Sequence, residues 1–153
     1  MPQITESASH GIAPDITSAI ARLHAAMGDV ANGDVTAIKA LYSHTADATS
    51  FYGWGGYETG WDAVARRWDW AAEQFKGGTV AYQSLTVVAA DTLFYATDIE
   101  TFEVRMAGMA EPTRWSNRVT HIFRLEGGEW RLLHRHGNRL EARYQPAARL
   151  SQG

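Results

Sequence analysis

The order of two hydrophobic periodicities constrains the fold of this chain more than any other feature. Apolar residues recur at helical spacing in the first half, and the spacing changes to alternation from Thr79 onward. Helices followed by a run of antiparallel strands are typical of α+β domains, whereas alternating helices and strands build parallel sheets. The sequence therefore predicts an α+β fold with its helices in the N-terminal half.

Three helices are expected. The first begins at Pro14-Asp15, because Pro suits a first helical turn and Asp can cap it, and it ends at Asn32-Gly33. Asp34 can cap a short second helix. The third helix follows Gly60 and ends at Gly77-Gly78.

A short extended run is expected at residues 48–52, followed by a glycine-rich loop at residues 53–57. Four longer strands are expected at residues 79–89, 92–105, 112–125 and 129–138. The turn Glu126-Gly127-Gly128 joins the last two as a hairpin. We divide the chain into a flexible tail over residues 1–13, one domain over 14–140 and a C-terminal tail over 141–153.

Composition excludes several function classes. The chain has 153 residues, no Cys and a net charge of -3, so disulfides and thiolate metal sites are excluded and a general nucleic-acid binder is disfavoured. It contains no apolar run of membrane-spanning length. We expect a cytoplasmic protein that has no cofactor and binds neither nucleic acid nor membrane.

Specific residues agree with a known family. The stretches are Gly33-Asp34, Leu41-Tyr42, Asp47-Ala48-Thr49, Gly60-Trp61 and the hairpin from Arg118 to His136. In these the chain resembles the SnoaL-like branch of the nuclear transport factor two-like superfamily. The resemblance implies a cone in which a curved, mainly antiparallel sheet wraps around three helices, with a small-molecule pocket inside and a homodimer through the outer sheet face. That fold hosts both enzymes and pure binders, so the resemblance does not select a reaction.

Ketosteroid isomerases share this resemblance. Their proton-abstracting Asp would correspond to Tyr52, their oxyanion Tyr to a position near Ala26, and their protonated Asp to His121. None of the three residue types is present, so the isomerase mechanism does not carry over.

Strand alternation predicts the pocket's polar residues. Trp130, Leu132, His134 and His136 share one face of a regular strand, and two of them are apolar, so that face should be the interior. By the same rule Val119, His121 and Phe123 share the inner face of the preceding strand. Arg118 and Arg135 should then lie on the outer face, in ion pairs with Glu100, Glu103 or Glu141.

Three roles for the histidines stay open. The first is acid–base catalysis, with His121 or His136 as base, a carboxylate such as Asp47, Glu100 or Glu103 to orient it, and Tyr52 as a hydrogen-bond donor to a ligand carbonyl. The second is a metal site made by His121, His134 and His136. The third is purely structural hydrogen bonding.

The sequence thus predicts a domain that binds a modest apolar molecule, with acid–base catalysis as a further hypothesis and a non-catalytic binding or dimeric assembly module as the alternative. The expected ligand-binding side chains share an inward or pocket-wall position: Trp54, Trp61, Trp68, Tyr95, Glu100, Phe123 and His134.

Overall fold

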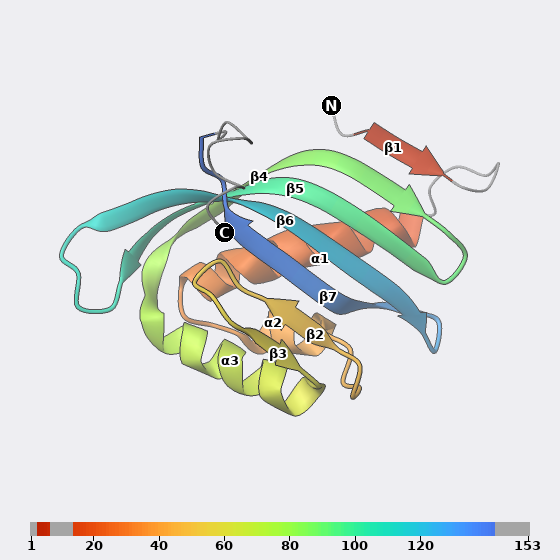
Figure 1. Cartoon of the computed structure of the whole chain (residues 1–153), viewed down its shortest axis with the longest axis horizontal. Coiled ribbons are helices and arrows are strands. Elements are labelled where there is room, and N and C mark those ends of the chain that lie inside the picture. Colours follow the sequence, from red (N-terminus) through yellow and green to blue (C-terminus); the bar gives the residue numbers. More distant parts are fainter. Residues whose placement is uncertain (1–2, 7–13, 143–153) are drawn as a thin grey trace, which may run out of the picture.

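A curved seven-stranded sheet wraps around one long helix (Figure 1). The computed structural model describes residues 3–6 and 14–142. Strand order across the sheet is β1-β4-β5-β6-β7-β2-β3. The elements in chain order are β1 (Gln3–Glu6), α1 (Pro14–Ala31), α2 (Thr36–Leu41), β2 (Thr49–Phe51), β3 (Tyr57–Thr59), α3 (Trp61–Gln74), β4 (Phe75–Ala89), β5 (Leu93–Met106), β6 (Pro112–Glu126) and β7 (Glu129–Arg139).

Helix α1 fills the concave face of the sheet because one of its sides is apolar. Leu23, Met27 and Val30 on that side are almost fully buried. Figure 1 shows α3 beyond α1, on the side of α1 away from the long strands β4, β5 and β6. The predicted α+β cone is therefore confirmed. No helix within residues 14–142 is both long and apolar enough to cross a membrane.

The start of α2 and the hairpin turn follow from local chemistry. Asp34 accepts a hydrogen bond of 2.9 Å from the backbone N–H of Thr36, at the start of α2. Gly127 and Gly128 both have positive φ, as the two-residue turn between β6 and β7 requires.

Two boundaries were predicted wrongly. Helix α3 ends at Gln74, before the glycines that were expected to end it, and β4 already begins at Phe75. Gly78 instead allows a close approach between β4 and β5, where a Cβ atom would collide with the carbonyl oxygen of Glu103.

The tails differ in part from expectation. Residues 3–6, assigned to a flexible tail, form β1, which pairs in parallel with residues 86–89 of β4. Short strands β2 and β3 frame the glycine-rich loop, and β3 was not predicted. Residues 7–13 and 143–153 lie outside the described part, so the flexibility expected there stays a prediction.

An apolar core closes one end of the cone. Phe94 stacks on Phe123 with ring centroids 4.5 Å apart, and Trp130 packs edge-on against Phe94. The indole Nε1 of Trp130 donates a 2.8 Å hydrogen bond to Asp15 at the start of α1. This contact fixes α1 against β7, and it leaves the other end of the cone for polar groups and a cavity.

Candidate functional site

A β-bulge in β7 decides which side chains reach the interior. Leu132 pairs with Phe123, and His134 pairs with the next residue, Ile122, so Leu133 is an extra residue without a partner. The bulge reverses the alternation, because side chains beyond it point to the opposite face from that expected for a regular strand. Arg135 therefore enters the cone, whereas His134 and His136 face outward.

Arg135 and Glu100 form the polar centre of the cone. The Arg135 guanidinium donates to both Glu100 oxygens, with Nη2 to Oε1 at 2.6 Å and Nη1 to Oε2 at 2.9 Å. Both side chains are buried, Glu100 completely. Tyr82 donates to Glu100 Oε2 at 2.5 Å, and Asn117 approaches Oε1 at 3.4 Å. Such a two-pronged pair with additional donors satisfies a buried carboxylate.

The network sets the charge of each member. Burial alone would raise the pKa of Glu100, but the Arg135 guanidinium outweighs it and lowers the pKa to about 2. Burial and the Arg135 charge together hold the pKa of His121 well below its usual value. Arg135 Nη1 lies 2.8 Å from His121 Nε2. A neutral His121 accepts this hydrogen bond at Nε2, so its own proton lies on Nδ1.

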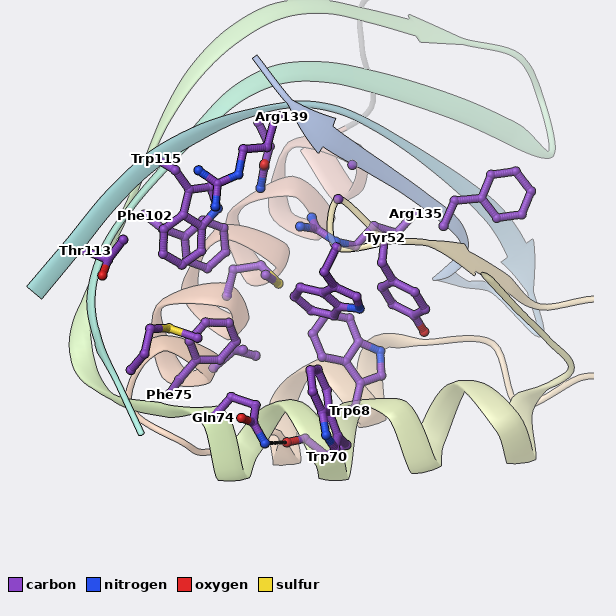
Figure 2. A pocket seen from close by; sticks show the side chains of 18 residues that line it. Tyr52, Trp68, Trp70, Gln74, Phe75, Phe102, Thr113, Trp115, Arg135 and Arg139 are labelled. Carbon is purple, nitrogen blue, oxygen red and sulfur yellow. Dashed lines mark hydrogen bonds between the residues drawn. The ribbon is translucent and has the colours of Figure 1, made fainter. Parts of the chain in front are cut away.

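An aromatic cavity of about 270 Å³ lies on one side of this pair. Figure 2 shows Phe75, Phe102 and Trp115 along one wall, and Tyr52 and Trp68 across the cavity from them. Trp115 and Phe102 stack almost in parallel with centroids 5.0 Å apart.

The polar side chains that line the cavity are those of Tyr52, Gln74, Thr113, Asn117, Arg135 and Arg139. Of these, Arg135 and Asn117 belong to the hydrogen-bond network around Glu100. At the rim, Arg139 lies over the Trp115 ring at 5.4 Å. Trp54 and Trp70, both partly exposed, pack edge-to-face at 5.4 Å. Among the described residues that line the cavity there is no Asp, Glu or His. The space therefore suits a flat, mostly apolar molecule with an oxygen at one end.

Comparison with known proteins decides the family. A family model of the SnoaL-like domain matches residues 16–138. The chain belongs to the SnoaL-like family. The match covers all the described helices and strands except three parts: β1, the first two residues of α1 and the last residue of β7. A search of curated proteins gave no match.

Solved structures agree on the fold of this SnoaL-like domain. An NTF2-like superfamily protein from Salmonella enterica serovar Typhimurium has a TM-score of 0.75 at 16% identity, over 86% of this chain and 92% of that one. A proposed dehydratase of the NTF2-like family from Streptomyces avermitilis has a TM-score of 0.68 at 16% identity, over 84% and 96%. A proposed scytalone dehydratase from Novosphingobium aromaticivorans has a TM-score of 0.68 at 13% identity, over 86% and 87%. At these identities the likeness shows the fold alone.

The SnoaL-like domain brings only some of the predicted residues to the cavity. Tyr52, Trp54 and Trp68 line it. Burial raises the pKa of Tyr52 to about 12, so this phenol stays protonated at neutral pH, where it can donate a hydrogen bond but not act as a phenolate base. His121 and Glu100 lie inside the cone but are separated from the cavity by Arg135, which contacts both.

Other predicted ligand-binding residues lie elsewhere. Trp61 packs on His44 with ring centroids 3.9 Å apart, Phe123 belongs to the closed apolar end, and Tyr95 is exposed on the outer sheet face. His134 accepts or donates at Nδ1 to the Thr49 hydroxyl at 2.7 Å, between β7 and β2. His136 is exposed and lines a shallow hollow on the outer face.

The three-histidine metal geometry was wrong. It required His134 and His136 to join His121 inside the cone, and the bulge at Leu133 turns both of them away. Within residues 3–6 and 14–142 no group of three or more potential ligands is placed to hold a metal ion.

The predicted outer-face position was correct for Arg118 and wrong for Arg135. Arg118 is exposed and bonds Asn138 at 3.1 Å. Glu103 pairs on the outside with Arg114, and Asp47 pairs with Arg124 rather than with a histidine.

Proposed function

We propose that this SnoaL-like domain binds a flat, mostly apolar molecule in the aromatic cavity, with a neutral oxygen of the ligand directed at Arg135. The observation that carries the proposal is a cavity with aromatic walls and hydrogen-bond donors but no carboxylate. Aromatic walls bind apolar rings, and the donors fix the ligand's orientation.

The donors in the cavity favour a carbonyl or hydroxyl over an anion. Arg135 makes three hydrogen bonds inside the protein, fewer than a guanidinium can donate. Its charge is already balanced by Glu100, so the pair offers N–H groups with little net charge. The indole Nε1 of Trp68 is a second donor, because it is buried without a partner in the described part of the chain.

We place binding ahead of catalysis at the cavity itself. Acid–base catalysis needs a group that exchanges protons near the working pH and lies within reach of the ligand. The predicted base His121 lies behind Arg135 and is held neutral, and the predicted base His136 faces outward. Two structures with this fold are described as proposed dehydratases, which are lyases. That likeness concerns the fold and does not favour a lyase reaction in this cavity.

Calorimetry with two-ring aromatic ketones and the matching hydrocarbons tests the proposal. We expect the ketones to bind about tenfold more tightly, because only they accept hydrogen bonds from Arg135 and Trp68. Trp115→Leu should weaken ketone binding by about tenfold through loss of the stacking wall. Tyr95→Leu is the matched control, since Tyr95 is an aromatic residue on the outer sheet face.

Two outcomes would contradict this assignment. One is equal affinity for ketones and hydrocarbons, which would remove the role of the donors. The other is an equal loss of affinity in Tyr95→Leu and Trp115→Leu, which would place the ligand outside the cavity.

We also infer a homodimer through the outer sheet face, as the family resemblance implied. Leu85, Tyr95 and Leu140 are exposed large hydrophobic residues on or beside that face. Sedimentation should give a dimer for the wild type and a monomer for Leu85→Glu, because a charge in an apolar contact is costly to desolvate. Met109→Glu, at an exposed turn, should leave the dimer intact. A monomeric wild type would contradict the inference.

A further inference from the structure

A second group of polar side chains lies inside the cone, next to the Glu100–Arg135 pair and outside the cavity lining. It consists of His24 on α1, Asp98 on β5 and His121 on β6. Asp98 and His121 are almost fully buried, and His24 is partly exposed at 27% of its side chain. On adjacent strands, Asp98 pairs with Val119 and Ala96 pairs with His121, so these two side chains are diagonal neighbours on the inner face.

Each of the three side chains has one buried polar atom without a hydrogen-bond partner in the described residues. The atoms are His24 Nε2, Asp98 Oδ2 and His121 Nδ1. Leaving such an atom unsatisfied is costly, so three of them on neighbouring side chains indicate that they bind a common partner.

The three atoms are complementary to a single small molecule. His121 Nδ1 carries a proton, because its Nε2 lies within hydrogen-bond distance of the Arg135 guanidinium, so Nδ1 is a donor. Asp98 Oδ2 is an acceptor when ionised and a donor when protonated. His24 Nε2 lies 4.0 Å from Asp98 Oδ1, too far for a direct hydrogen bond and suitable for a bridge.

We propose that His24, Asp98 and His121 bind one water molecule, and that this water passes a proton between buried Asp98 and partly exposed His24. When Asp98 is protonated, its O–H gives a proton to the water oxygen while the water gives one of its own protons to His24 Nε2. One O–H bond forms on the water as another breaks, leaving an Asp98 carboxylate, an imidazolium at His24 and an unchanged water. His121 Nδ1–H donates to the water and holds it in place.

The groups around the water support this exchange. Tyr82 on β4 stacks on the His24 ring with centroids 3.9 Å apart and fixes its orientation. Burial raises the pKa of Asp98 to about 6, and the nearby Glu100 charge adds to the rise, against a hydrogen bond from Ser84 and the charge of Arg135. Burial lowers the pKa of His24, and Glu100 opposes that effect. The two groups therefore approach each other in proton affinity, which is the condition for easy transfer.

Nuclear magnetic resonance on the full-length wild-type chain tests the water. We expect the ring of His121 to carry its proton on Nδ1, and that proton to show a nuclear Overhauser effect to a bound water. A proton on Nε2, or the lack of any water contact at this ring proton, would overturn the proposal without requiring a mutant to fold.

A titration tests the proton exchange. The Asp98 carboxyl carbon and the His24 ring nitrogens should change over the same pH values in the wild type, in two coupled steps. In His24→Gln, Asp98 should titrate in a single step. His136→Gln removes an exposed histidine on the outer face and should leave both steps unchanged. Identical Asp98 titrations in the wild type and His24→Gln would overturn the exchange.

Discussion

Replacing Arg135 with Met is expected to lower the free energy of unfolding by about 3–5 kcal/mol, the largest effect of any single change at the site. The variant leaves the Glu100 carboxylate fully buried without its cation, and it removes the donor to His121 Nε2. Loss of one partner of a buried pair costs more than the pair contributes, because the remaining charge has no water to solvate it. Urea unfolding at pH 7 measures the difference.

A matched ion pair on the same sheet provides the control. Arg114 and Glu103 pair across β5 and β6 at 3.2 Å, but both side chains are mostly exposed. Arg114→Met should therefore cost below about 1 kcal/mol. Adding Glu100→Gln to Arg135→Met should regain about 1–3 kcal/mol by removing the uncompensated charge. If Arg114→Met and Arg135→Met cost the same, Glu100 is not buried as described.

The bulge explains why the fold was predictable from the sequence and part of the site was not. Alternation located β5, β6 and β7 to within a residue or two, because the periodic pattern extends over whole strands. One extra residue, Leu133, then exchanged the inward-facing and outward-facing side chains in the rest of β7. The residue types around Leu133 do not indicate a bulge, because this bulge does not require a glycine. A regular strand was therefore assumed, and it placed His134 and His136 inside the cone instead of Arg135.

A signal for Arg135 was nevertheless present in β5. Alternation from Phe94 to Val104 places Asp98 and Glu100 on the same inner face as those apolar residues. A buried carboxylate is stabilised either by a nearby cation or by binding a proton. Two inward carboxylates on one strand therefore predict a buried cation, a carboxyl group with a raised pKa, or one of each. Arg135 is the cation of Glu100, and Asp98 is the carboxylate whose pKa rises. The inward carboxylates of β5 are therefore the sequence signal that a cation lies inside the cone.

Replacing Asp98 with Asn is expected to raise the free energy of unfolding at pH 7 by about 3 kcal/mol. Burial raises the pKa of Asp98 to about 6 from its ordinary value of 3.8. The folded state therefore holds this proton more tightly than the unfolded state does. The wild type is fully stabilised by this group below its unfolded pKa, loses that stability as the pH rises through the folded pKa, and has lost it at pH 7.

The gain from Asp98→Asn should consequently depend on pH. At pH 4 the folded wild type keeps the Asp98 proton and the unfolded chain already holds roughly 40% of it, so the difference between variant and wild type should shrink to about 0.5 kcal/mol. Asp91→Asn, at an exposed turn, is the control and should change stability little at either pH. A gain of equal size at pH 4 and pH 7 would mean that ionisation of Asp98 is not its cause. A gain confined to neutral pH would mean that the ionised Asp98 carboxylate lowers the stability of the folded domain. A group that exchanges protons inside the cone must be able to ionise there, so this loss of stability is what the proposed exchange requires.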